Sequence, residues 1–111
     1  VEKRPWGNFH VIAKGVGYQI KEMNVNPKNK LSLQKHHHRS EYWQVIEGEG
    51  KVYLEDSEIK LRTGHNVFIP KGSLHRLVNN TKNNLKIVEI QIGDVLSEDD
   101  IERFEDDYGR V

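Results

Sequence analysis

Turn-forming residues recur at such short intervals along this chain that it has room for strands but hardly for helices. They stand at Asn26-Pro27, Gly48-Glu49-Gly50, Asp56-Ser57, Thr63-Gly64, Pro70-Lys71-Gly72 and Asn79-Asn80-Thr81. Between them lie short runs of alternating apolar and polar side chains, as in Lys51–Glu55 and Ile87–Ile92. Alternation with a period of two is typical of strands with one buried face. Many such strands in succession favour a sandwich or barrel over units of alternating strand and helix.

Only the tail of the chain indicates a helix. Ser97 and the three acidic residues after it resemble a helix N-cap followed by a negatively charged first turn, which the helix dipole favours. Ile101 and Phe104 are three residues apart, as on one helix face, and Tyr108 follows one turn later. We therefore predict a short C-terminal helix after the strands.

The composition limits both the size and the partners of the protein. Its 111 residues fit one domain, assigned to residues 1–111, and its 17 basic and 17 acidic residues leave no net charge. A neutral chain has no overall field that attracts nucleic acid or an anionic membrane. The chain has no Cys, which excludes disulfides and thiolate chemistry. Its apolar runs are too short for a transmembrane helix or a signal peptide. We therefore expect a soluble, cytoplasmic domain.

Histidines are concentrated in the middle of the chain. Five of the six lie between positions 36 and 75, and His36 and His38 would share one strand face with Gln34. Glu41 follows closely, and His75 would come from a distant strand. Imidazole, carboxylate and amide groups form a mixed nitrogen and oxygen set that suits a borderline divalent ion. A solvated strand would carry the same histidine run, and a lone His75 is more often a surface residue.

A second stretch makes the metal interpretation specific. The order Gly, five residues, Pro, one residue, Gly, two residues, His, three residues, Asn is similar to the second motif of the cupin superfamily. This chain has it as Gly64, Pro70, Gly72, His75 and Asn79. The resemblance implies a cupin double-stranded β-helix, which is a jelly-roll barrel with a metal inside.

The first cupin motif is also present, with one departure. Glu41 and Gly48 fit its spacing, and counting back from Glu41 places the usual histidine pair at Gln34 and His36. Gln therefore replaces the first His. We prefer Gln34, His36, Glu41 and His75 as ligands over a set containing His38, which would leave only two residues before Glu41. Zinc is the preferred ion, and manganese, cobalt, nickel or iron would also fit.

A narrower resemblance covers nearly the whole chain. Its segments Arg4–Gly7, Leu31–Trp43, Pro70–Asn79 and Asp99–Arg110 are similar to type II phosphomannose isomerase. That cupin usually forms the C-terminal domain of a bifunctional enzyme that is also a mannose-1-phosphate guanylyltransferase. The resemblance leaves open whether this chain is stand-alone or part of such an enzyme. It implies a metal-dependent aldose–ketose isomerase that interconverts mannose 6-phosphate and fructose 6-phosphate.

Such an isomerase needs a general base and a binding site for phosphate. His38 is our first candidate for the base because it would share the ligand face. Glu89 is the second candidate, or else an acceptor that orients a ligating imidazole. Trp43 shares parity with Glu41, which predicts a place on the pocket floor or in the core. Candidate phosphate-binding cations, each of which is also an ordinary surface charge in the simpler interpretation, are Arg39, Arg76 and Lys71.

The apolar pattern also bears on assembly. If Gln34 and His36 face the pocket, Leu31 and Leu33 face outward and need cover, from the N-terminal segment around Trp6 or from a second subunit. Hydrophobic residues make up only 35% of the chain, which indicates a thin core. We therefore predict a two-fold homodimer.

Two other functions compete with the isomerase. A non-catalytic cupin that binds a sugar phosphate or a nucleotide sugar would keep the barrel and the metal but exchange no proton at C2 of the sugar. A metal-dependent oxygenase is the other alternative, because the same fold supports many reactions. Nothing in the sequence favours the oxygenase.

Overall fold

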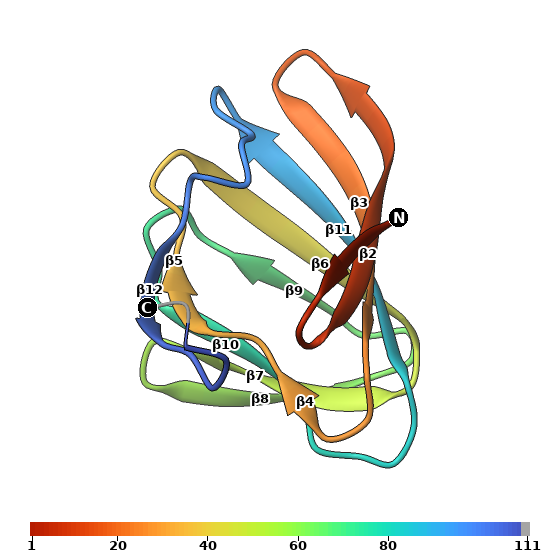
Figure 1. Ribbon diagram of the computed structural model, residues 1–111. Helices are drawn as coiled ribbons and strands as arrows, with labels where there is room; N and C mark the ends of the chain where they lie inside the picture. The colour runs from red at the N-terminus through yellow and green to blue at the C-terminus, as the bar shows by residue number, and fades with distance from the viewer. Residues whose placement is uncertain (110–111) are drawn as a thin grey trace.

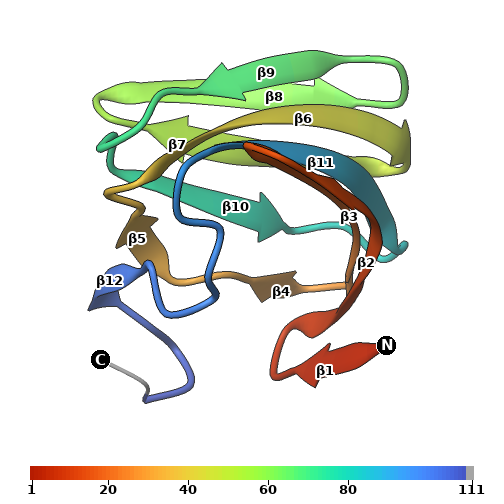
Figure 2. The same ribbon diagram turned by 90° about the horizontal axis from the view of Figure 1, so that it is seen from above.

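A computed structural model describes residues 1–109, which form two facing antiparallel β-sheets (Figures 1 and 2). One sheet has the strand order β1-β2-β3-β11-β6-β9, and the other β12-β5-β10-β7-β8, with β4 also paired to β10. Neighbours such as β3 and β11 are distant in sequence, as in a jelly roll. The all-β prediction is confirmed. The bounds are β1 Glu2–Arg4, β2 Gly7–Gly15, β3 Tyr18–Val25, β4 Asn29–Lys30, β5 Leu33–Lys35, β6 Arg39–Glu47, β7 Glu49–Leu54, β8 Ser57–Arg62, β9 Asn66–Ile69, β10 His75–Asn79, β11 Leu85–Gly93 and β12 Glu102–Glu105.

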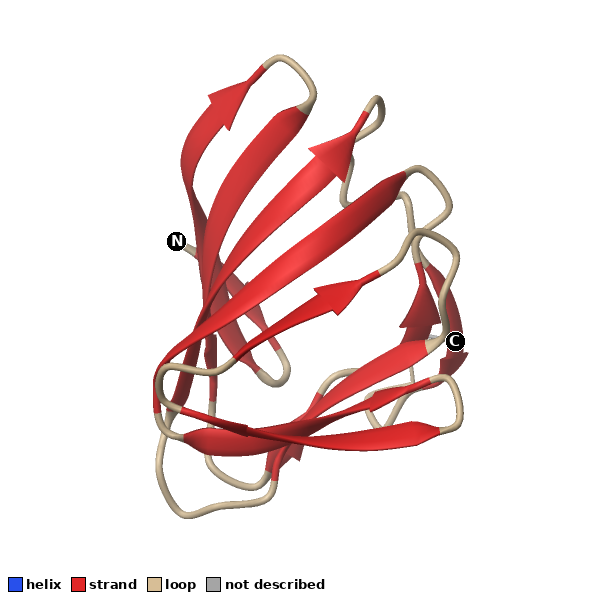
Figure 3. Cartoon of the chain, turned by 180° about the vertical axis from the view of Figure 1, so that it is seen from behind, coloured by secondary structure: helices blue, strands red, loops and turns tan. Residues whose placement is uncertain are grey.

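The predicted C-terminal helix is wrong. The described part of the chain contains no helix (Figure 3), and Ser97 caps a single turn through its hydroxyl, which accepts the amide of Asp99. The next residues form β12, which pairs with β5. The exposed edge of β5 offers backbone partners that outweigh a weak local helix preference. No helix in residues 1–109 is long and apolar enough to cross a membrane. Arg110, at the end of the family-like tail, lies outside the described residues.

The interior changes from apolar to polar along its length. On β11 the inward side chains run from Leu85 and Ile87 to Glu89 and Gln91, all of them buried. Strand β6 is antiparallel to β11, and its inward side chains therefore change from polar to apolar along the chain. The polar ends of both strands coincide. This arrangement leaves an apolar core at one end of the barrel and a buried polar cavity at the other.

Two motif residues fix the apolar end. The amide of Asn79 donates to the carbonyl oxygens of Val25, Asn26 and Asn83, and its oxygen accepts from Thr81. Gly48, at the turn between β6 and β7, has a φ of +92°, and a Cβ there would lie 2.4 Å from a backbone oxygen. Only glycine tolerates that position without strain. The cupin-like spacing therefore encodes turns as well as ligands.

The structure changes the reason for expecting a dimer. Leu31 packs against the core and lines the cavity instead of facing outward, and Leu33 lies opposite Glu105 of β12. Strand β12 therefore covers the edge of β5 without a second subunit. The homodimer stays a prediction.

A different surface is apolar and uncovered, on the outside of the first sheet. Cross-strand partners there form one continuous row over five strands, through Phe68, Tyr42, Ile90, Ile20 and Ala13. The rings of Tyr42 and Phe68 are 4.7 Å apart, and both side chains are more than 40% exposed. Outer faces of antiparallel sheets are usually polar, so an apolar row of this length points to an interaction surface.

Candidate metal centre

Three predicted ligands converge in the polar half of the interior. His36 directly follows β5, Glu41 lies on β6, and His75 is the first residue of β10. All three are buried, and their ligand atoms lie within 4.8 Å of one another. The pairing of Gln34 with His75 brings the two motifs together, because it places β5 beside β10 and opposite β6. The structure therefore brings together the two distant β segments, as predicted.

Both imidazoles present the same nitrogen to the cavity. Nδ1 of His36 lies 2.6 Å from the carbonyl oxygen of Asp100, and Nδ1 of His75 lies 3.1 Å from that of Ser73. A carbonyl oxygen only accepts hydrogen bonds, so each Nδ1 carries the proton and each Nε2 keeps a lone pair. Burial, with a contribution from the charge of Arg39, lowers the pKa of His36 to about 4, and burial also lowers the pKa of His75. Neutral imidazoles held in this way are competent metal ligands.

The carboxylate of Glu41 is held on both oxygens. Trp43 Nε1 donates to Oε1 at 2.8 Å, and Arg39 Nε donates to Oε2 at 2.7 Å. Burial alone would lower the pKa of Arg39, but the charges of Glu41 and Glu89 outweigh it and raise that pKa. Trp43 lines the cavity and also belongs to the buried core, the two places that its parity predicted, and its ring packs edge-on against His75 at 5.8 Å.

Gln34 lies in the same cavity and is buried. Its Nε2 donates to the carbonyl oxygen of Ser32 at 3.3 Å and to the Ser32 hydroxyl at 3.0 Å. Because the carbonyl only accepts, the orientation of the Gln34 amide is fixed, and Oε1 is left as its acceptor. Two neutral imidazoles, a carboxylate and this amide oxygen fit a borderline divalent ion. Coordination by Gln34 stays a prediction.

His38 does not share the ligand face. Strand β5 ends at Lys35, so the two-residue alternation stops before His38, whose side chain is exposed and absent from the cavity lining. Its backbone amide donates instead to the carboxylate of Asp100, as does that of His37. Burial would raise the pKa of Asp100, but these two amides outweigh it and lower that pKa. The expectation that His38 points into the pocket was wrong.

Glu89 is a second buried carboxylate in the cavity wall. Gln91 Nε2 donates to Glu89 Oε1 at 2.9 Å, and Gln19 Nε2 donates to Gln91 Oε1 at 3.0 Å. Burial, reinforced by the negative charge of Glu41, raises the pKa of Glu89. A chain of amides thus holds a buried carboxyl group whose pKa is raised above that of an exposed one.

Of the predicted phosphate-binding cations, only Arg39 lies in the cavity. Its three nitrogens bind Glu41, His36 and the carbonyl oxygen of Ser97. Arg76 instead donates to the carbonyl oxygen of Leu31 and pairs with Glu105, and Lys71 is exposed in the turn before β10.

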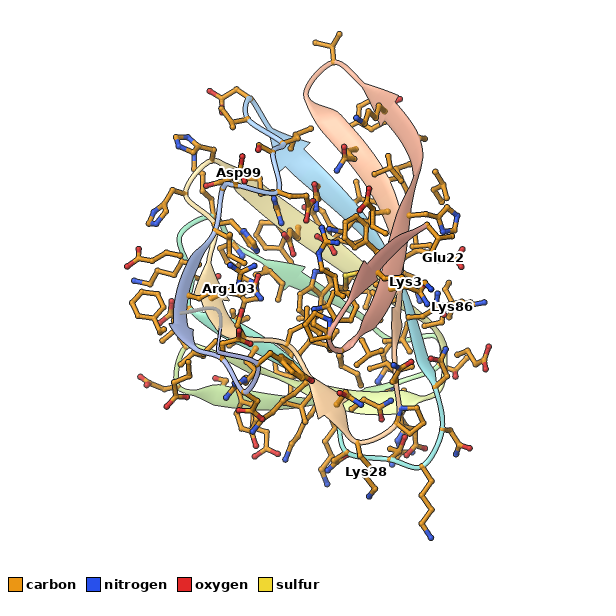
Figure 4. All side chains as sticks on the ribbon, in the orientation of Figure 1. Lys3, Glu22, Lys28, Lys86, Asp99 and Arg103 are labelled. Carbon is orange, nitrogen blue, oxygen red and sulfur yellow. The ribbon has the colours of Figure 1, made fainter. Side chains whose placement is uncertain are left out.

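Sequence reasoning missed three other cations that line the cavity, namely Arg4, Lys21 and Arg103, the last of which is labelled on β12 in Figure 4. Lys21 is only 4% exposed, pairs with Glu98 at 3.2 Å, and lies 4.1 Å from the centre of the Phe9 ring. Parity was the available signal, because Lys21 alternates inward with Met23 and Val25. No local signal marked Arg103, since it enters the cavity only because β12 pairs with β5.

The segment between β11 and β12 contacts three side chains of the cavity wall. Ser97 accepts a hydrogen bond from Arg39, Glu98 pairs with Lys21, and Asp100 binds His36. We call residues 94–101 the strap. Its contacts with the cavity are mostly polar and are made with the same side chains that form the candidate site.

The fold is that of a cupin domain, the double-stranded β-helix. An uncharacterised conserved protein with a double-stranded β-helix domain from Klebsiella pneumoniae superposes with a TM-score of 0.79 at 15% identity, covering 95% of this chain and 90% of that one. CapF, in a crystal structure with an inhibitor, gives a TM-score of 0.79 at 17% identity, covering 94% of this chain and 33% of that one. At these identities the similarity concerns the fold alone.

Sequence similarity assigns the family. The model of the family described as "Mannose-6-phosphate isomerase C-terminal" matches residues 2–106, and the chain belongs to that family. The alginate biosynthesis protein AlgA of Pseudomonas aeruginosa is 46% identical over 108 residues, which are 97% of this chain and 22% of that protein. The mannose-1-phosphate guanylyltransferase of Escherichia coli is 46% identical over 110 residues, covering 97% of this chain and 23% of that protein. The chain thus spans about a fifth of these relatives' length.

Proposed function

We propose that this domain interconverts mannose 6-phosphate and fructose 6-phosphate with the help of a divalent ion. The observation that carries the proposal is the buried convergence of His36, Glu41 and His75 beside a second carboxylate, Glu89, in a chain of the isomerase family. A role in supplying sugar phosphates for polysaccharides agrees with relatives named for alginate and xanthan biosynthesis.

The reaction moves a proton between two neighbouring carbons of the open-chain sugar. A divalent ion held by His36, Glu41 and His75, with Gln34 as a fourth ligand, would polarise the carbonyl group and stabilise the negative charge that develops on its oxygen. Glu89 is then our candidate for the base. Its carboxyl group is held by Gln91, is buried in the same wall, and has a raised pKa that suits a group taking up and returning a proton.

The phosphate group needs cationic partners at the cavity. Besides Arg39, which binds Glu41, the cavity is lined by Arg4, Lys21 and Arg103, and we take these three as the candidates. Lys21 already binds one carboxylate of the strap. An anionic group of the substrate would compete with Glu98 for the same ammonium group.

The test is a coupled assay of the purified protein loaded in turn with zinc, cobalt, manganese and magnesium. We expect conversion of mannose 6-phosphate and incorporation of solvent deuterium at C2. His75→Ala should abolish both, whereas His65→Ala, which changes an exposed histidine outside the cavity, should leave both intact. Glu89→Gln should keep the metal and lose deuterium exchange. Binding of the sugar phosphate without turnover under any ion would reject the isomerase and favour the non-catalytic cupin.

A further inference from the structure

The guanidinium group of Arg39 lies among the candidate metal ligands. Its Nε is 2.7 Å from Glu41 Oε2, its Nη2 is 3.3 Å from His36 Nε2, and its Nη1 is 3.3 Å from the carbonyl oxygen of Ser97. Arg39 is only 4% exposed. A positive charge therefore already stands where two of the three candidate ligands point.

Nε2 of His36 cannot bind Arg39 and a metal ion at the same time. Because Nδ1 of His36 donates to Asp100, Nε2 has a single lone pair. That lone pair either accepts a hydrogen bond from Arg39 or binds a metal ion. Glu41 differs, because each carboxylate oxygen has two lone pairs and can serve Arg39 and an ion together.

Charge balance explains why the chain places an arginine here. Glu41 is 2% exposed, and a buried carboxylate without a partner is strongly unfavourable. Arg39 neutralises it before any ion arrives. An arriving divalent ion would meet this guanidinium group at close range in a poorly solvated cavity, where like charges repel strongly.

We propose that Arg39 is a resident counter-cation of the metal centre: it occupies the lone pair of His36 in the metal-free protein, and a divalent ion binds only by displacing its Nη2 end. The inference rests on the metal centre of the proposed function. The displaced end of the side chain also carries Nη1, which holds the strap at Ser97. Metal loading and release of this strap contact are therefore coupled.

The test measures metal affinity alone, without any sugar. Zinc and cobalt affinities are determined by competition with a fluorescent chelator for the wild type, Arg39→Met and Arg39→Lys. Removing a charge-assisted competitor should tighten binding by about tenfold or more in Arg39→Met. Arg39→Lys keeps the charge but loses the planar fork, and its affinity should lie between the two. Arg62→Met, which removes an exposed arginine, should bind as the wild type does. Equal or weaker binding by folded Arg39→Met or Arg39→Lys would overturn the inference.

A measurement on the wild type avoids any folding defect of the variants. In nitrogen-15 spectra, the Arg39 side-chain signals should exchange slowly with solvent in the metal-free protein, and their Nη signals should shift and exchange faster at saturating zinc. Unchanged signals would overturn the inference.

The outcomes also separate this inference from the isomerase proposal. If only Arg39→Met binds an ion, Arg39 is confirmed as a competitor, and the isomerase proposal fails for this chain. If wild type and variant both bind no ion, the inference and the ligand set fail together. Metal binding with the expected order of affinities but without turnover would reject the isomerase alone.

Discussion

Replacing Glu41 by Gln tests how the polar half of the interior is stabilised. The substitution keeps the size of the side chain but removes the charge that pairs with Arg39 at 2.7 Å. Both side chains are less than 5% exposed, so solvent cannot take over the lost interaction. The new amide also has only one acceptor oxygen for the two donors, Arg39 Nε and Trp43 Nε1, that now bind Glu41.

Breaking one partner of a buried ion pair costs about 3–5 kcal/mol. That is a large share of the roughly 5–15 kcal/mol by which domains are stable. We expect Glu41→Gln to lower the free energy of unfolding by this amount in urea titrations at pH 7 with a chelator present. Arg39→Met should be destabilised by a similar amount. The double variant leaves neither charge stranded, so it should be more stable than the sum of the single effects implies, by about 3 kcal/mol.

Two results would refute this reasoning. A loss of less than about 1 kcal/mol for Glu41→Gln would mean that solvent reaches the pair as it does at a surface. Strictly additive effects in the double variant would mean that Arg39 and Glu41 do not depend on each other. Arg62→Met should show no measurable coupling to Glu41→Gln, because Arg62 is exposed and outside the cavity.

Three further predictions concern pH, loops and assembly. Because the pKa of His36 is lowered from 6.5 to about 4 in the folded protein, the unfolded chain takes up a proton first as the pH falls. The free energy of unfolding of the metal-free protein should therefore fall by about 3 kcal/mol between pH 6.5 and pH 4, and that of His36→Gln should not, as urea titrations at the two pH values would show. Asn79→Ala should lower the unfolding free energy by about 2 kcal/mol or more, with unchanged zinc affinity, because it removes bonds between loops and no ligand. If the predicted homodimer uses the uncharged row at Tyr42, where two copies meet without repulsion, Tyr42→Lys should sediment as a monomer; an unchanged association state would exclude this face.

The sequence was sufficient for the elements whose signal is local. Alternation predicted the strands, and the motif spacing predicted that His36, Glu41 and His75 meet. The prediction of a C-terminal helix failed because the local helix signal was weak and the distant edge of β5 pairs with residues 102–105. The prediction that His38 shares the ligand face failed for a related reason. Alternation holds only inside a strand, and nothing in three consecutive histidines marks where β5 ends.

Charge compensation was the least predictable part, and the reason is physical. An inward charge needs a partner from whichever segment folds over it. Lys21 on β3, for example, pairs with Glu98 of the strap, 77 residues away. Arg39 is the exception, because it stands two residues before Glu41 on the same strand and therefore shares its face. That spacing was visible in the sequence, where Arg39 was instead a candidate cation for the phosphate of the substrate. A buried carboxylate must be neutralised from the moment the barrel closes, whether or not an ion is present. Strand β6 therefore supplies both the candidate ligand, Glu41, and the cation that neutralises it when no ion is bound, Arg39.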